Sequence, residues 1–180
     1  MNKQNCKTEV LEAQKDINFE KSKYQVKFET SMGDILLDLY ADKAPLHAKN
    51  IIGLSKAGYY DGLTFHRVIP NFVIQGGCSV GNGTGDAGYK IKAEFNQEKH
   101  EPGVLSMARA QDPNSAGTQF FLCTGKSPFL DGQYTVFGKT ADDESLNTVM
   151  RIAKVPTGAG DKPKEPVTIN KAVVVETVMQ

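Results

Sequence analysis

The sequence of 180 residues predicts one mainly β domain, an antiparallel barrel or sandwich that carries two helices. Three observations support this prediction. Short apolar runs recur along the chain, most of the 17 glycines fall between them, and only two segments have the spacing of an amphipathic helix. A parallel sheet would need a long crossover, usually a helix, between successive strands. We therefore expect antiparallel strands joined by turns.

Residues 1–23 are mostly polar and charged, and we expect them to form a solvated arm, with at most a helical turn or two, outside the core of a domain that spans residues 24–180. From Tyr24 to Thr30 apolar and polar residues alternate, which is typical of a half-buried strand. Met32-Gly33 then predicts a turn, and residues 34–40 are the expected hairpin partner.

Two segments predict helices. The first has Asp42 as its expected N-cap, a proline in its first turn and Gly58 at its end. The second covers residues 144–155, where Asp142 or Asp143 can cap the helix. The remaining apolar runs predict strands at residues 64–69, 72–75, 104–108, 118–124, 134–137 and 167–178.

The composition limits the classes of function. The 21 basic and 21 acidic side chains cancel, so the chain lacks the excess positive charge on which nonspecific binding to nucleic acid depends. Its apolar runs are far shorter than the roughly 20 residues of a membrane-spanning helix. We therefore expect neither nucleic acid nor a membrane as a partner.

The three cysteines, at positions 6, 78 and 123, form no CxxC motif, and the three histidines have no HxxxH or HxH spacing. We therefore expect no disulfide framework, metal or cofactor, and we place the protein in a reducing compartment, the cytoplasm. Residues 1–23 contain no apolar signal core, although a signal or lipid-anchor segment removed upstream would leave no trace.

The most informative block is FHRVIPNFVIQGG at residues 65–77. Arg67 and Gln75 lie there among aromatic and branched residues, so they must be paired with other polar groups or line a cleft. Pro70-Asn71 between them can bend the chain so that both face one groove. Pairing of Arg67 with a buried carboxylate stays open as an alternative.

Further blocks follow in a specific order: LSMARA at 105–110, NSAGTQFFLCT at 114–124, FLDG at 129–132 and VFG at 136–138. Together with the first block, over about residues 24–178, they resemble the signature of the cyclophilin-type peptidyl-prolyl cis-trans isomerases. The resemblance implies a closed eight-stranded antiparallel barrel that is capped by two α-helices. The active groove is then expected on the outer face of the barrel.

The resemblance also implies a role for each matching residue. Arg67 is the expected catalytic residue. The expected proline pocket consists of Phe72, Val73, Phe121 and Leu130, and the substrate backbone is held by Gln75, Gln119, Ala108, Arg109 and Ala110. Phe129 and Tyr134, which replace a tryptophan and a histidine of many members, are further expected substrate contacts. For Tyr134 the alternative is a packing role at the groove edge.

The resemblance implies catalysis of rotation about Xaa-Pro peptide bonds, which assists protein folding. Proline-containing peptides and unfolded protein clients are the expected partners of a monomeric enzyme, and weakened cyclosporin binding is expected because Phe129 lacks the indole N–H that donates to this ligand in relatives. The alternative is a proline-binding adaptor or chaperone in which turnover is secondary and residues 1–23 recruit a partner.

Overall fold

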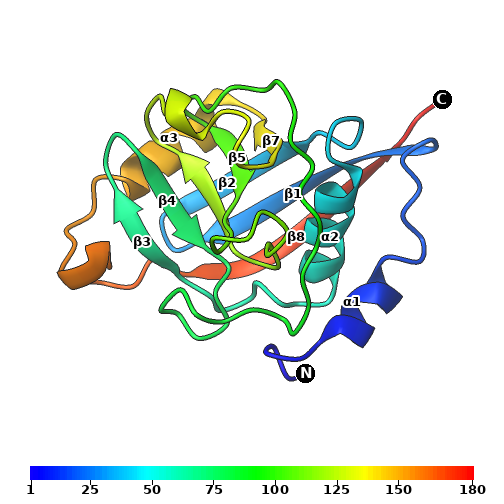
Figure 1. Ribbon diagram of the computed structural model, residues 1–180, viewed down its shortest axis with the longest axis horizontal. Coiled ribbons are helices and arrows are strands. Elements are labelled where there is room, and N and C mark those ends of the chain that lie inside the picture. Colours follow the sequence, from blue (N-terminus) through cyan, green and yellow to red (C-terminus); the bar gives the residue numbers. More distant parts are fainter.

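The computed structural model describes residues 1–180, which form eight strands and three α-helices (Figure 1). The elements are, in chain order, α1 (Lys7–Ala13), β1 (Ser22–Thr30), β2 (Gly33–Leu39), α2 (Pro45–Lys56), β3 (Phe65–Ile69), β4 (Val73–Gly76), β5 (Val104–Met107), β6 (Phe120–Cys123), β7 (Val136–Thr140), α3 (Asp143–Ile152) and β8 (Ile169–Val178). Two short 3₁₀ helices cover Pro128–Leu130 and Ala159–Asp161. None of the helices has the length and apolarity that a bilayer crossing requires.

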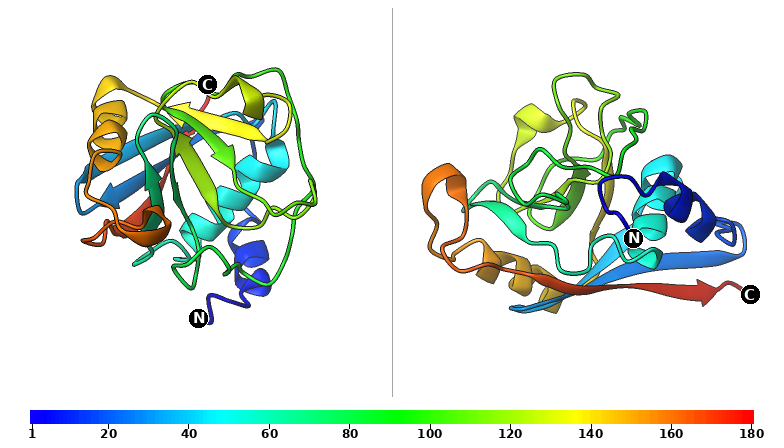
Figure 2. Two further views of the ribbon diagram at one scale, coloured as in Figure 1. Left: turned by 60° about the vertical axis from the view of Figure 1, so that its left-hand side comes forward. Right: turned by 90° about the horizontal axis from the view of Figure 1, so that it is seen from below.

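The eight strands form one antiparallel sheet in the order β3-β4-β6-β5-β7-β2-β1-β8, which curls into a half-barrel (Figure 2). Its two edge strands, β3 and β8, are not joined by a ladder. They meet only where an isolated bridge pairs Thr64 with Thr168, flanked by hydrogen bonds such as that from the Phe65 N–H to the Val167 carbonyl. The predicted closed barrel is therefore wrong. Beyond the bridge, β3 pairs with β4 and β8 pairs with β1, so the two edges diverge.

The first α-helix, α1, corrects the expectation that residues 1–23 lie outside the core and that the fold has two helices. Cys6 and Val10, one helical turn apart, are fully buried in the main hydrophobic cluster. Helix α1 packs closely on α2. Gly53 of α2 leaves no room for a side chain there, because a Cβ atom on it would lie 2.7 Å from Cγ of Gln14, the residue that follows α1. That residues 24–180 form a domain of their own stays a prediction.

The predicted helix caps have different outcomes. Helix α2 begins at Pro45 and its N-cap position is Ala44, which supplies no side-chain hydrogen bond, so the prediction of Asp42 as the cap is wrong. Helix α3 is capped as predicted, because the side chain of Asp142 accepts a hydrogen bond of 2.8 Å from the Ser145 N–H. The hairpin of β1 and β2 is confirmed, with Thr30 opposite Gly33 at its turn.

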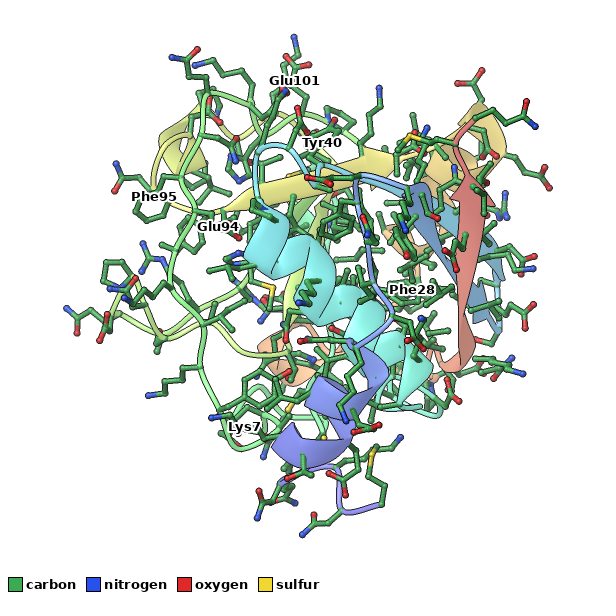
Figure 3. The ribbon with its side chains drawn as sticks, turned by 90° about the vertical axis from the view of Figure 1, so that its right-hand side faces the viewer. Lys7, Phe28, Tyr40, Glu94, Phe95 and Glu101 are labelled. Carbon is green, nitrogen blue, oxygen red and sulfur yellow. The ribbon has the colours of Figure 1, made fainter.

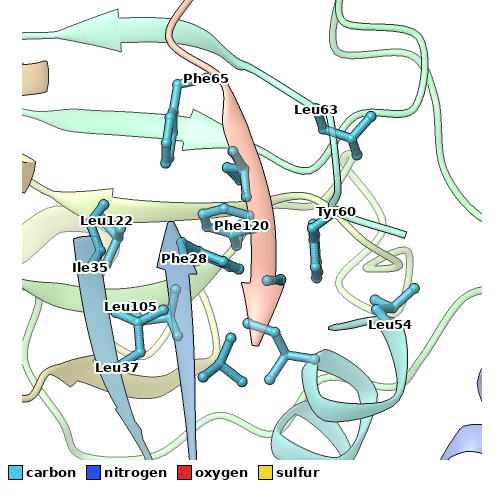
Figure 4. Packing of buried hydrophobic residues seen from close by; sticks show 14 of the residues in the cluster. Phe28, Ile35, Leu37, Leu54, Tyr60, Leu63, Phe65, Leu105, Phe120 and Leu122 are labelled. Atoms are coloured by element: carbon cyan, nitrogen blue, oxygen red, sulfur yellow. The ribbon is translucent and has the colours of Figure 1, made fainter. Parts of the chain in front are cut away.

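The main core lies inside the curved sheet, where the rings of Phe28, Tyr60 and Phe120 pack together (Figure 4). Their ring centroids are 5.2–5.6 Å apart. Strand β6 is buried on both faces. Phe120 points into this core, whereas the next residue, Phe121, points to the opposite face and belongs to a second buried cluster. The four buried members of that cluster are Val73, Phe121, Cys123 and Leu130. An apolar surface is thereby built on the outer face of the sheet.

Candidate functional site

The hairpin of β3 and β4 brings Arg67 and Gln75 together. The two residues are opposite each other in the ladder, and Nη1 of Arg67 donates a hydrogen bond of 3.4 Å to Oε1 of Gln75. Asn71 in the intervening turn has a φ of 61°, a conformation that asparagine tolerates better than most residues. Arg67 forms no ion pair with a carboxylate, which excludes the alternative of a buried Arg67–carboxylate pair in this structure.

A hollow of about 210 Å³ opens beside Arg67, and six of its nine lining residues are hydrophobic. Those nine are Arg67, Phe72, Val73, Gln75, Ala108, Arg109, Phe121, Leu130 and Tyr134. The Arg67 guanidinium carbon lies 5.8 Å from the centre of the Phe72 ring. The hollow therefore combines an apolar wall with two charged donors, Arg67 and Arg109. We call it the apolar hollow.

Tyr134 and Arg109 form another part of the wall of the apolar hollow. The Tyr134 ring meets Phe121 edge to face at 5.9 Å, and the Arg109 guanidinium carbon lies 4.4 Å from the centre of the Tyr134 ring. The same guanidinium donates to the backbone carbonyl of Gln133, with a distance of 2.7 Å from Nη2. Arg109 is thus held against the protein, and its own side chain fixes the position of Tyr134.

Phe121 packs against the ring of His100, a residue that the sequence did not single out. The two rings stack at 5.9 Å with an interplanar angle of 21°. Nδ1 of His100 lies 2.9 Å from Oδ1 of Asp131 and Nε2 lies 2.8 Å from Oγ of Ser106. Burial lowers the pKa of His100, an effect that Asp131 partly opposes. No local sequence signal identifies this network, because its members come from separate segments.

A second hollow, of about 300 Å³, adjoins the first and shares Gln75, Ala108 and Arg109 with it. We call it the polar hollow, because only two of its 13 lining residues are hydrophobic. Gln119 crosses its floor: Nε2 donates to the carbonyls of Gly83 and Gly85 at 2.9 and 3.0 Å, and Oε1 accepts from Nε2 of Gln75 at 3.2 Å.

The glycine-rich loop at residues 81–85 lines part of the polar hollow, which sequence reasoning missed. Its spacing does not match a dinucleotide-binding loop, and the sequence favours a plain surface loop. In the structure, the Sγ atom of Cys78 accepts hydrogen bonds from the backbone N–H groups of Gly81, Gly83 and Gly85, with N to Sγ distances of 3.1–3.3 Å. The density of glycines and the cysteine that precedes them were the available sequence signal.

Three of the predicted substrate contacts lie outside the apolar hollow, and one of them, Gln119, lines the polar hollow as described above. Ala110 lines the polar hollow only. Phe129 lines neither hollow; its side chain is 69% exposed and stacks on the outer side of Phe72 at 5.8 Å. The other predicted site residues line one or both hollows, so the structure gathers the predicted set on one face of the sheet.

The chemistry available here is that of binding and hydrogen-bond donation. No group of three or more His, Cys, Asp or Glu side chains has the arrangement of a metal site. The apolar hollow can hold a small non-polar ring, and Arg67 can donate a hydrogen bond to an atom at its mouth. The polar hollow offers the amides of Gln75 and Gln119 and exposed backbone groups to a chain that passes through it.

Comparison with known proteins gives concordant results. Residues 25–174 match the model of the family described as "Cyclophilin type peptidyl-prolyl cis-trans isomerase/CLD". A peptidyl-prolyl cis-trans isomerase of Synechococcus elongatus is 52% identical over 125 residues, which cover 69% of this chain and 86% of the relative. One of Schizosaccharomyces pombe is 43% identical over 153 residues, which cover 82% and 97%.

Solved structures also resemble this fold. The crystal structure of a cyclophilin type peptidyl-prolyl cis-trans isomerase of Cryptosporidium parvum has a TM-score of 0.79 and 33% sequence identity, and it covers 86% of this chain and 98% of its own. The structure of the same protein in the presence of the dipeptide Ala-Pro has a TM-score of 0.78 and 35% identity, with 84% and 98% coverage.

Proposed function

Because this chain belongs to the cyclophilin-type peptidyl-prolyl cis-trans isomerase family, we propose that the apolar hollow beside Arg67 is the active site at which it catalyses rotation about Xaa-Pro bonds. The observation that carries the assignment is the position of the Arg67 guanidinium. It lines an apolar hollow and donates a hydrogen bond to Gln75, which orients it. The comparisons do not favour the alternative of an adaptor in which turnover is secondary.

The mechanism follows from the electronic structure of the amide. The rotation barrier of about 18–20 kcal/mol arises because the nitrogen lone pair is delocalised into the carbonyl. In the twisted state the prolyl nitrogen becomes pyramidal and its localised lone pair is a better hydrogen-bond acceptor. A donor held beside that nitrogen therefore binds the twisted state more strongly than the planar one, which lowers the barrier. In our proposal Arg67 is this donor.

One hydrogen bond does not supply the whole acceleration. A hydrogen bond to a charged group contributes about 1.5–3 kcal/mol, which corresponds to roughly 10- to 150-fold in rate. We assign the remainder to two other features. The apolar hollow removes water from the amide, and the polar groups along the polar hollow hold one flank of the chain while the other flank turns.

The proposed substrate contacts divide between the two hollows. The proline ring lies on Val73, Phe121 and Leu130, against the wall formed by Phe72 and Tyr134. The amides of Gln75 and Gln119 and the backbone of Ala108, Arg109 and Ala110 bind the peptide groups of the flanking chain. Phe129 extends the apolar wall outward by its stacking on Phe72. The presence of Ala-Pro in a structure of the Cryptosporidium protein supports this class of ligand.

We further propose that the protein assists folding of unfolded clients, as a monomer and in a reducing compartment such as the cytoplasm. Both hollows are lined within a single chain, so the proposed site does not require a second copy. The three cysteines are free and buried, which is compatible with a reducing environment.

Refolding of a client whose slow phase is limited by prolyl isomerisation tests the enzyme against the adaptor. An isomerase accelerates this phase when it is present in a small fraction of the client concentration, whereas an adaptor acts only near equal concentration. Acceleration at substoichiometric concentration is the expected result, and the absence of any acceleration of the slow phase contradicts the proposal. Deletion of residues 1–23 is an unsuitable test, because it removes Cys6 and Val10 from the core.

A further inference from the structure

A groove of about 210 Å³ lies away from the apolar hollow, between α1, α2 and residues 89–91 (Figure 3). Its walls carry Val10 and Leu11 of α1, Leu46 of α2 and the adjoining Tyr89 and Ile91. We call it the α1–α2 groove. Leu11 and Leu46 are about half exposed, at 53% and 50%, and together with the other apolar lining residues they form a contiguous apolar surface rather than isolated exposed side chains. Helix α1 lies outside residues 25–174, so the family domain alone does not build this groove.

The rim of the α1–α2 groove is positively charged. Lys7, Lys49 and Lys90 line it, all three are exposed, and no acidic residue is among the lining residues. None of the three lysines forms an ion pair within the protein. In a chain of zero net charge, three uncompensated cations therefore surround one apolar groove.

The neighbouring carboxylates form no ion pair with these lysines. Glu94 lies on the segment that runs beside α2, but its carboxylate accepts hydrogen bonds from the backbone N–H groups of Leu46 and His47 and lies 2.7 Å from Nδ1 of His47 (Figure 3). Glu9 of α1 does not line the groove. The lysines are therefore available to carboxylates from outside the protein.

The α1–α2 groove adjoins the polar hollow, which in turn adjoins the apolar hollow. Lys90 lines both the groove and the polar hollow. Asn50, which lines the groove, donates a hydrogen bond of 2.7 Å to the carbonyl of Gly117, which lines the polar hollow. Tyr89 donates to the side-chain oxygen of Asn50 at 2.5 Å and so holds this junction in place. A polypeptide that leaves the polar hollow at Lys90 therefore arrives at the groove.

We propose that the α1–α2 groove is an extended binding site for the substrate polypeptide, specific for an aliphatic or aromatic side chain flanked by aspartate or glutamate. The apolar side chain would lie between Leu11 and Leu46, and the carboxylates would meet Lys7, Lys49 and Lys90. This inference rests on the proposed function, because the occupant is the same chain whose proline occupies the apolar hollow. Such a site makes the enzyme prefer those prolines that are linked, some residues away, to a segment of this kind.

Peptide turnover measured by NMR exchange tests the proposal. The first substrate is a short Ala-Pro peptide. Two further series carry a Glu-Leu-Asp segment on the N-terminal or the C-terminal side, with glycine-serine spacers of about three to ten residues, because an extended chain spans about 3.3 Å per residue. For one side and one range of spacers we expect the KM to be about tenfold lower than for the short peptide, which is about 1.4 kcal/mol. The kcat is expected to be unchanged.

Two double variants separate the charged and apolar parts of the site. In Lys7→Glu/Lys49→Glu the gain of the long peptide is expected to disappear, and in Leu11→Ser/Leu46→Ser it is expected to fall, while both variants turn over the short peptide normally. The matched control, Lys21→Glu/Lys154→Glu, changes the same net charge away from the groove and is expected to keep the gain. Added salt is expected to reduce the gain.

The inference is overturned if neither long series has a lower KM than the short peptide. It is also overturned if the Lys7→Glu/Lys49→Glu variant keeps the full gain. These outcomes differ from a failure of the proposed function, which would appear as absent turnover of the short peptide by the unmodified protein.

Discussion

Nη1 of Arg67 donates a hydrogen bond of 3.4 Å to Oε1 of Gln75, its neighbour across the β3–β4 ladder. Gln75 in turn donates from Nε2 to Gln119, whose own amide donates to the carbonyls of Gly83 and Gly85. The guanidinium is therefore held by a chain of amides that ends in the glycine-rich loop. Because one N–H direction of Arg67 is fixed in this way, other N–H groups can point at a bound amide nitrogen.

Gln75 is accordingly expected to position Arg67. Gln75→Ala removes one hydrogen bond to the guanidinium, and since a net hydrogen bond contributes about 0.5–1.5 kcal/mol, kcat/KM is expected to fall by about 2- to 12-fold. NMR exchange on a short Ala-Pro peptide measures this, with the melting temperature as a control for folding. Unchanged kcat/KM in a variant with unchanged melting temperature would show that Arg67 needs no support from Gln75.

Phe129 determines the expected response to cyclosporin. Its side chain is 69% exposed and stacks on Phe72, but a phenyl ring has no N–H to donate. We therefore expect ordinary isomerase activity with weakened inhibition by cyclosporin, and a partial gain of inhibition in Phe129→Trp. An inhibition titration of both proteins against the same peptide tests this. Potent inhibition of the unmodified protein would contradict the role given to position 129.

Cys78 is expected to stabilise the glycine-rich loop through its acceptor atom. Burial acts to raise the pKa of this thiol, but the backbone N–H groups that it accepts lower the pKa below its ordinary value. Cys78→Ala leaves the N–H groups of Gly83 and Gly85 without that acceptor, whereas the Gly81 N–H retains the Cys78 carbonyl, and the change is expected to destabilise the fold by about 1–3 kcal/mol. Cys78→Asp retains an acceptor and is expected to be closer to the unmodified protein. Urea denaturation that gives equal stability for both variants would contradict this account.

His100 is expected to make stability depend on pH. Burial lowers the pKa of His100 below 6.5, so on acidification the unfolded chain binds a proton before the folded protein does. Its contribution is therefore fully present above about pH 6.5 and is lost as the pH falls from there through the folded pKa. His66 acts in the same direction, since burial lowers its pKa as well. The free energy of unfolding, measured from about pH 8 to about pH 5, is expected to decrease.

The variant His100→Asn isolates this contribution. Its free energy of unfolding is expected to fall less steeply over the same pH range, because the contribution of His100 is removed while that of His66 remains. The carboxylates of Glu94 and Asp131, whose pKa values are lowered from 4.5 and 3.8, titrate below this range. An identical slope for the variant and the unmodified protein would mean that His100 is not held neutral by its surroundings.

Sequence reasoning predicted best where the determining contacts are local. The alternation from Tyr24 to Thr30 and the cap at Asp142 both reflect neighbours within a few residues, and both are confirmed. The burial of α1 was missed because only Cys6 and Val10 face the core, while charged residues surround them. Two apolar positions in a charged segment give too weak a periodicity to indicate a packed helix.

The parts that depend on distant segments were beyond the sequence. The open edge of the half-barrel is decided by how far β3 and β8 follow one another past Thr64 and Thr168, and no local pattern encodes that. The support of Phe121 by His100 is likewise a tertiary contact. The predicted site residues, by contrast, came from a resemblance that spans nearly the whole chain, and the structure brings them to one face.

The central claim is that Arg67 stabilises the twisted amide. NMR exchange with a saturating Ala-Pro peptide, on the unmodified protein, Arg67→Ala and Arg67→Lys, tests it most directly. We expect kcat to fall by about 10- to 150-fold in Arg67→Ala, with an unchanged melting temperature, and little recovery in Arg67→Lys, because an ammonium lacks the planar fork that Gln75 orients. Near-normal kcat in a folded Arg67→Ala protein would contradict the claim.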